Sequence, residues 1–205
     1  MIIPNAVDPS ELDTRADPSL FRSRYGIGDN RKLVLFVGRL IKVKGVHLLP
    51  RIARLLGSMG DDLYFAVVGD GSLCEPLRNW VEKMGLKNPV ITGRVSQEEL
   101  SAYKAADMVL IPSQSEWMPV AELEATLFRK PVVVTHLLTI TDCSNRACRM
   151  VEPGDTYGYA AAISQTQKTP PSDEQLLSAE QHGAENLNWS QLSNSILEVY
   201  REVTE

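Results

Sequence analysis

The sequence predicts an α/β protein built on a doubly wound parallel sheet. Short apolar runs, rich in Val, Ile and Phe, alternate along most of the chain with segments that carry apolar residues at helical spacing. Because these runs are apolar throughout, they are expected to be strands buried on both faces of the sheet. Right-handed crossovers between parallel strands leave few other ways to bury them. The chain has 205 residues, which suffices for one domain with a sizeable core.

The expected elements follow in order. Residues 1–30 should form an irregular lead-in with one short helix around Ser19–Tyr25, and residues 31–165 should form the main sheet domain. The expected strands are Leu33–Val37, Leu63–Val68, Val90–Thr92, Met108–Ile111 and Pro131–Thr135. The expected helices between them are Val46–Met59, Leu73–Met84, Gln97–Ala105 and Val120–Phe128. A break in periodicity between Ser164 and Gln175 precedes two last helices within residues 166–205 of the same domain, Glu174–Gln181 and Ser190–Val203.

Composition and charge exclude several classes. The formal net charge of −5 is unfavourable for a nucleic-acid binder, so any phosphate site must be local. No apolar run approaches the length of a membrane span. The N-terminus lacks the pattern of a secretory signal, which favours a cytoplasmic location. The three cysteines have neither zinc nor redox spacing and are interpreted as free structural thiols.

Four loops directly follow predicted strands. They are Gly38-Arg39, Gly69-Asp70-Gly71, Gly93-Arg94 and Pro112–Glu116. Ligands of open parallel sheets bind beyond the carboxyl ends of the strands, so all four loops should line one rim. His136 follows the strand Pro131–Thr135 and should sit on the same rim.

Two cations accompany the first of these loops. Arg39 offers a planar fork of donors, and Lys44, beside the flexible Gly45, offers a movable point charge. Strand-to-helix turns also supply unpaired backbone N–H groups at the positive end of a helix dipole, where a diphosphate can bind. The plain alternative is a pair of surface cations.

Two carboxylates, with seven residues between them, flank the predicted start of a helix. Glu116 is expected in the loop, because Pro119 fits the first helical position. Glu124 lies one to two turns into the helix, where a carboxylate can accept hydrogen bonds from two neighbouring ribose hydroxyls. Glu122 should point to nearly the opposite side. The expected core-facing stripe is Val120, Leu123 and Leu127. Together with the cations, these acids suggest a nucleotide-sugar site; an exposed loop acid is the plain alternative for Glu116.

Other site chemistries find little support in the sequence. No Asp-x-Asp pair is present, so a chelated metal has no obvious ligands. Gly69-Asp70-Gly71 resembles the start of a dinucleotide fingerprint, but Cys74 occupies its third position. A dehydrogenase-like Rossmann domain would have to bind NAD, and this incomplete fingerprint disfavours that alternative. The expectation is therefore a site with neither a metal nor a cofactor.

Eight ordered motifs extend over nearly the whole chain. They are Ile3-Pro4-Asn5-Ala6-Val7-Asp8, Val37-Gly38-Arg39-Leu40 with Lys44-Gly45, Val68-Gly69-Asp70-Gly71, Thr92-Gly93-Arg94-Val95, Ala106-Asp107, Pro112-Ser113, Glu116 to Glu124, and Pro153-Gly154-Asp155. Together they resemble one family, glycosyltransferase family 4 (group 1). More narrowly, the chain is similar to the C-terminal, donor-binding half of two-domain GT-B enzymes, which is Rossmann-like.

The resemblance implies retaining, metal-independent transfer of a hexose-type sugar from a UDP- or GDP-linked donor. It assigns Arg39 and Lys44 to the donor diphosphate, Glu124 to the ribose and Glu116 to the transferred sugar, so that Arg39, Lys44 and Glu116 form the catalytic set. The loop at Gly93-Arg94-Val95 would meet the base. The implied nucleotide-binding set is Gly38, Arg39, Lys44, Gly69, Gly71, Gly93, Arg94, Val95, Val120 and Glu124.

Departures from the family pattern leave a second hypothesis open. Trp117-Met118-Pro119 stands where members usually carry Gly-aromatic-Gly, and Lys130 replaces a usual glycine. These changes favour a non-catalytic nucleotide-binding or regulatory module derived from the same domain. The acceptor-binding half is also absent, so the chain is expected to be a fragment of a longer enzyme or to pair with a partner chain. Peripheral membrane association is compatible with the resemblance.

Overall fold

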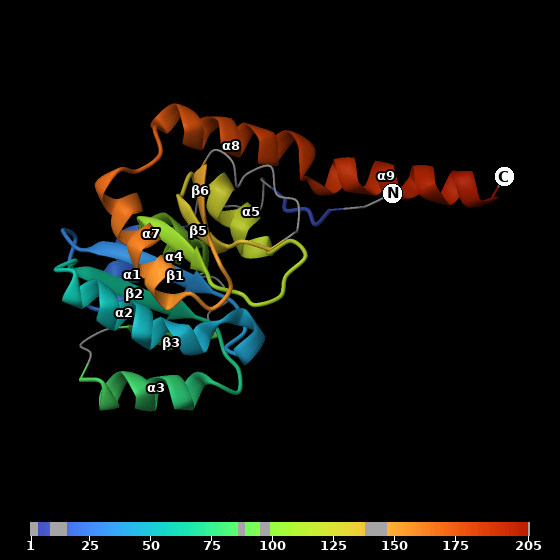
Figure 1. The fold of residues 1–205 in the computed structure, drawn as a ribbon. Coiled ribbons are helices and arrows are strands. Elements are labelled where there is room, and N and C mark those ends of the chain that lie inside the picture. The colour runs from blue at the N-terminus through green and yellow to red at the C-terminus, as the bar shows by residue number, and fades with distance from the viewer. Residues whose placement is uncertain (1–3, 9–15, 86–88, 95–98, 138–146, 205) are drawn as a thin grey trace.

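The computed structural model describes residues 4–8, 16–85, 89–94, 99–137 and 147–204. Six parallel strands form one sheet in the order β3-β2-β1-β4-β5-β6 (Figure 1). The strands are β1 (Lys32–Val37), β2 (Leu63–Val68), β3 (Val90–Gly93), β4 (Met108–Ile111), β5 (Val132–Thr135) and β6 (Cys148–Val151). The predicted doubly wound α/β fold is therefore confirmed, because the chain proceeds outward from β1 in one direction and then from β4 in the other.

Helices cover both faces of this sheet. They are α1 (Pro18–Arg24), α2 (Leu49–Ser58), α3 (Cys74–Lys83), α4 (Glu99–Ala105), α5 (Val120–Leu127), α7 (Thr156–Lys168), α8 (Asp173–Asn186) and α9 (Trp189–Thr204). Two short 3-10 turns, η1 (Lys42–Lys44) and η2 (Val46–Leu48), precede α2. The predicted helix over Val46–Met59 thus starts as a 3-10 turn, and Pro50, which has no N–H, lies in the first turn of α2.

The central strands send alternate side chains into two apolar cores. On β1, Val34 and Phe36 join the core under α2, α3 and α7, whereas Leu33 and Leu35 join the core under α1, α4 and α5. The first core receives a buried stripe at helical spacing from α2: Leu49, Ile52 and Leu56. Continuous apolar runs are therefore needed because both faces of each central strand are covered.

The sequence missed two elements near the end of the sheet. β6 lies at the sheet edge and contains the half-buried Arg149, so it lacks a continuous apolar run. α7 follows Asp155, whose carboxylate caps the helix by accepting from the Gly158 N–H at 2.9 Å. The break expected between Ser164 and Gln175 is present at residues 169–172, but it begins later than Ser164, since α7 continues to Lys168 and crosses the division suggested at residue 165.

The amino edge of the sheet is held by Asp107. Its carboxylate accepts from the Leu33 N–H at 2.9 Å and from Lys32 Nζ at 2.7 Å. Arg22 of α1 lies 3.3 Å from the same carboxylate and also donates to the Ala105 carbonyl at 2.7 Å. The short helix of the lead-in is thereby attached to β1 and to the turn between α4 and β4.

The last two helices leave the body of the sheet. α8 packs against α5, where Gly183 allows close approach to Leu127, and α9 extends away from the sheet (Figure 1). A capping box formed by Ser172 and Gln175 starts α8 earlier than the predicted N-terminus. None of the helices in the described parts of the chain combines the length and apolar character that crossing a membrane requires.

Candidate functional site

A cavity of about 400 Å³ opens beyond the carboxyl ends of β1 and β4. These strands are neighbours at the centre of the sheet, where the strand order reverses. Open parallel sheets bind ligands at such switch points. The lining comes from the loops after β1 and β4, the start of α5 and the N-terminal segment: Asn5, Phe36, Val37, Gly38, Arg39, Lys44, Ile111, Ser113, Glu116, Met118, Pro119, Val120, Ala121 and Glu124.

Close backbone packing joins two of these loops. Gly45 has a φ of +73° and lies against the carbonyl group of Pro112, so that a Cβ at this position would overlap the carbonyl oxygen. Nearby, the Gln114 N–H donates to the Val43 carbonyl at 2.7 Å. Lys44, which precedes this glycine, is thereby brought to the loop that follows β4.

Lys44 and Glu116 meet across the cavity wall. The Lys44 ammonium donates to Oε1 of Glu116, and the two side chains are 24% and 15% exposed. Ser113 donates a hydrogen bond of 3.2 Å to the same oxygen. Arg39 is exposed at the cavity, and its guanidinium forms no ion pair with any residue that the structure describes. The cavity thus contains one paired cation and one whose donors face solvent.

Glu124 forms the wall opposite the loops, on the second turn of α5. Its Oε2 accepts a hydrogen bond of 2.7 Å from the hydroxyl of Tyr103 on α4. Burial raises the pKa of the Glu124 carboxyl above its ordinary value, and the Tyr103 hydrogen bond opposes part of that rise. The carboxylate is therefore partly desolvated, and hydrogen-bond donors from a ligand would replace lost hydration.

The other residues of α5 divide between the cavity and the cores. Leu123 is buried as expected, and Glu122 is 1% exposed and lies outside the cavity, so it does not share a ligand with Glu124. Val120 is 44% exposed and lines the cavity. Its expected place in the core-facing stripe is therefore wrong, because Pro119 acts as the N-cap and the first helical residue faces the loops.

The sequence of the chain matches a known family. The model of "Glycosyl transferases group 1" matches residues 19–179. The chain belongs to the group 1 glycosyltransferases. Relatives include an alpha-D-kanosaminyltransferase of Streptomyces kanamyceticus, 31% identical over 82% of this chain and 42% of that protein. A D-inositol 3-phosphate glycosyltransferase of Corynebacterium urealyticum is 30% identical over 89% of this chain and 46% of that protein. The chain spans less than half the length of these two relatives.

Solved glycosyltransferases share this fold. A Rickettsia africae glycosyltransferase superimposes on all of this chain and on 57% of its own, with a TM-score of 0.86 at 19% identity. Anabaena HepE, solved in complex with UDP, covers 98% of this chain with a TM-score of 0.80 at 22% identity, and the match spans 57% of HepE. This group 1 glycosyltransferase domain is therefore one Rossmann-like unit of a fold that is longer in its neighbours.

Six of the predicted site residues share one cavity. They come from the loop after β1, the loop after β4 and α5: Gly38, Arg39, Lys44, Glu116, Val120 and Glu124. Sequence separations reach 86 positions between the first and last of them, and the parallel sheet removes that separation by ending β1 beside β4. Their assigned roles in binding and catalysis stay predictions.

Other predicted residues lie elsewhere. A Cβ at Gly69 would overlap the Gly38 carbonyl, and a Cβ at Gly71 would lie 2.6 Å from the Leu40 oxygen, so both glycines pack the loop after β2 against the loop after β1. Neither glycine is among the residues that line the cavity.

The loop after β3 and the loop after β5 also lie outside the cavity lining. Gly93 ends β3 and Arg94 follows it at the same edge of the sheet, but neither lines this cavity, and Val95 lies outside the described residues. His136 forms a contact of 3.1 Å with the Glu152 carboxylate and is likewise not a lining residue. Two of the four predicted rim loops therefore build the cavity.

Sequence reasoning missed several lining residues. Asn5 donates through Nδ2 to the Met118 carbonyl at 2.7 Å and so brings the N-terminal segment to the cavity. Ser113 orients Glu116, as described above. The motif around Asn5 was noticed, but no spacing rule connects position 5 with position 118.

No metal site is apparent in the described parts of the chain. Among those residues, no three His, Cys, Asp or Glu side chains gather as a metal site would require. Metal independence remains an expectation from the family resemblance.

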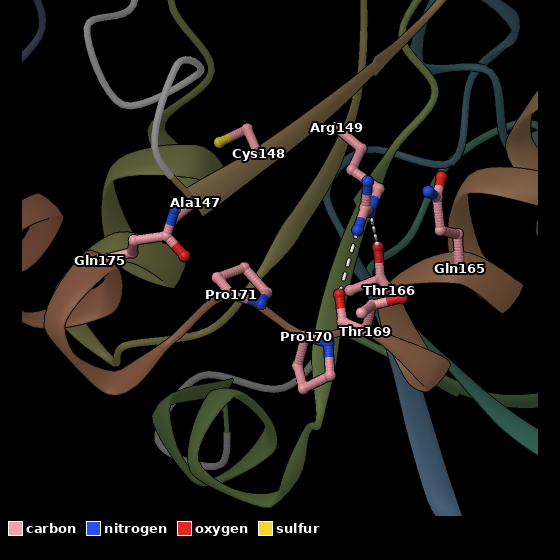
Figure 2. Close-up of a pocket in the computed structure, with 9 residues that line it drawn as sticks. All are labelled: Ala147, Cys148, Arg149, Gln165, Thr166, Thr169, Pro170, Pro171 and Gln175. Atoms are coloured by element: carbon pink, nitrogen blue, oxygen red, sulfur yellow. Dashed lines mark hydrogen bonds between the residues drawn. The ribbon is translucent and has the colours of Figure 1, made fainter.

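A second cavity of about 290 Å³ lies at the opposite edge of the sheet, between the start of β6, the end of α7 and the start of α8 (Figure 2). Arg149 donates to Thr166 Oγ1 at 2.9 Å and to the Thr169 carbonyl at 3.0 Å. Its guanidinium therefore donates hydrogen bonds to acceptors at the C-terminal end of α7. No predicted site residue lines this cavity.

Proposed function

We propose that this chain is the nucleotide-sugar-binding part of a retaining, metal-independent GT-B glycosyltransferase of family 4, which transfers a hexosyl group. One observation carries the proposal. Two cations and two acids, Arg39, Lys44, Glu116 and Glu124, line a single cavity at the switch point of the sheet. A nucleoside diphosphate sugar carries anionic phosphates and neutral hydroxyls, and this cavity offers complementary groups for both.

The cations supply the electrostatic part of the mechanism. Negative charge on the diphosphate grows as its bond to the sugar breaks, and Arg39 and Lys44, which both line the cavity, would stabilise that charge. Lys44 is held against Glu116, so its ammonium lies at the cavity wall before a donor binds. In this arrangement Lys44 would contact the diphosphate and its partner Glu116 would contact the transferred sugar.

The acceptor site would come from another half of the protein or from a partner chain. The relatives are more than twice as long as their matched regions, and their names describe different glycosyl transfers. Their names therefore do not identify the acceptor of this chain. Cytoplasmic location and peripheral membrane association also stay predictions from the sequence and the family resemblance.

Calorimetric titration with UDP, GDP and UDP-glucose tests this proposal. UDP is the first ligand to try, because the structure of Anabaena HepE was solved with it. We expect saturable binding of one nucleotide per chain, with the matching UDP or GDP sugar binding at the same site. A chain that is folded by circular dichroism and binds neither nucleotide would contradict the proposal.

A non-catalytic nucleotide-binding module is the second candidate. Its supporting observation is the segment after Glu116: Pro119 has no backbone donor, the Met118 carbonyl is occupied by Asn5, and Trp117 is 79% exposed. An assay of the longer protein, or of this chain combined with an acceptor-binding half, separates the two. Sugar transfer that Glu116→Ala abolishes supports the enzyme, whereas nucleotide binding without any transfer supports the module.

The proposed role of Glu124 predicts a pH dependence. The ionised carboxylate accepts charge-assisted hydrogen bonds from both ribose hydroxyls, whereas the protonated acid is neutral, turns one oxygen into a donor and accepts more weakly. Because burial raises the pKa of Glu124, UDP-glucose affinity should be constant above that pKa and fall by up to about tenfold per pH unit below it. UDP-glucose is the suitable ligand, since its diphosphate is esterified at both ends and does not titrate in this range.

Two variants identify the titrating group. Glu124→Gln should bind UDP-glucose more weakly at neutral pH and lose the acid-side fall in affinity. Glu116→Gln removes the other carboxylate of the cavity and should retain that fall. An unchanged pH profile in Glu124→Gln would show that another group is responsible.

A further inference from the structure

Tyr103 contacts α5 at two places. It is fully buried on α4, and its hydroxyl donates to Oε2 of Glu124 at 2.7 Å. Its ring stacks on Phe128, with 5.6 Å between ring centroids and an interplanar angle of 7°. Glu124 and Phe128 are four residues apart and so occupy the same face of the helix. The ring contact therefore fixes where the hydroxyl meets the carboxylate.

We propose that Tyr103 is a positioning residue that orients the Glu124 carboxylate and thereby sets a preference for ribonucleotides over deoxyribonucleotides. This inference rests on the proposed function, in which Glu124 binds the ribose. The terminal torsion of a glutamate has only broad preferences, so a hydrogen bond decides how its carboxylate plane is turned. An ionised carboxylate has about four acceptor positions, and Tyr103 uses one of them. The remainder suffice for two vicinal hydroxyls.

The same hydrogen bond favours the ionised carboxylate. Burial on α5 disfavours the charge of Glu124, and donation by Tyr103 opposes that effect. The charged groups that share the cavity with Glu124 are Arg39 and Lys44 from the loop after β1 and Glu116 from the loop after β4. Since Lys44 and Glu116 are paired with each other, the Tyr103 hydroxyl is the hydrogen-bond partner of the Glu124 carboxylate among the residues that the structure describes.

Tyr103→Phe is the informative variant, because it keeps the ring and its stacking on Phe128 and removes only the hydroxyl. Tyr159 provides a matched control. It is equally buried, its hydroxyl lies 2.6 Å from Thr135 Oγ1, and it belongs to the opposite core under α7. Both variants remove one buried hydroxyl, but only Tyr103→Phe changes the environment of Glu124.

The experiment compares the dissociation constants of UDP and 2′-deoxy-UDP. In the native chain we expect UDP to bind about tenfold more tightly or better, as a hydrogen bond to a charged group implies. Tyr103→Phe should reduce that ratio by about two- to tenfold, while Tyr159→Phe leaves it unchanged. In a Glu124→Gln background, adding Tyr103→Phe should have no further effect on the ratio.

A second readout follows the carboxylate itself. The acid-side midpoint of UDP-glucose binding should move to higher pH in Tyr103→Phe, and the carboxyl carbon resonance of Glu124 should titrate at higher pH as well. A native ratio and a native midpoint in a folded Tyr103→Phe chain would overturn the inference and leave the proposed function intact. Failure of the native chain to bind any nucleotide would instead overturn the proposed function.

Discussion

Arg39→Ala and Lys44→Ala should each weaken UDP binding by about tenfold to a hundredfold. Each cation is expected to make a charge-assisted hydrogen bond to the diphosphate, which contributes about 1.5–3 kcal/mol. The larger loss is expected for Lys44→Ala, because this change also leaves the half-buried Glu116 carboxylate without its cation, beside the incoming phosphates. Calorimetric titration of UDP at fixed ionic strength measures both effects.

Lys42→Ala is the matched control. Lys42 begins the same 3-10 turn as Lys44 and is exposed, but it does not line the cavity. Its removal should change UDP affinity by less than about threefold, since exposed charges that make no contact are screened by salt. Equal losses in all three variants would mean that the loop attracts phosphate through general charge, with no specific pocket.

The central fold could be predicted because each strand carries its own signal. β1, β2 and β4 are continuous apolar runs, and their predicted bounds differ from the observed ones by at most one residue. β6 has no continuous apolar run. It lies at the edge of the sheet, where less of the strand is buried and a charged residue such as Arg149 is tolerated. α7 was missed although it is rich in alanine, because its small side chains give little periodic contrast.

The candidate site was predictable to the extent that sheet geometry brings loops together. Arg39 and Glu124 could be placed in one cavity from the rule that parallel strands end at the same edge. The Lys44–Glu116 pair and the Tyr103–Glu124 hydrogen bond depend on side-chain directions in loops and between helices. No periodicity in the sequence encodes those directions. Close backbone packing between loops also requires glycine at Gly69 and Gly71, and their assignment to the ligand stays a prediction.

Gly45→Ala should have a large effect on both stability and UDP binding. The residue adopts a φ of +73°, which L-residues with a Cβ seldom adopt, and an added Cβ would overlap the Pro112 carbonyl. The two loops must then separate, which is expected to cost about 2–5 kcal/mol of unfolding free energy. Separation would also remove Lys44 from Glu116, so UDP affinity should fall at least as far as in Lys44→Ala. Urea denaturation and UDP titration measure the two losses.

Gly26→Ala separates backbone strain from overlap. Gly26 has a similar φ of +65°, but an added Cβ would meet no atom within 4 Å. Its substitution should therefore cost only about 1–2 kcal/mol and leave UDP affinity unchanged. If Gly45→Ala lost no more stability than Gly26→Ala and still bound UDP normally, contact between the loops after β1 and β4 would not be what holds the cations in place. The positions of the strand ends would then be sufficient to form the cavity.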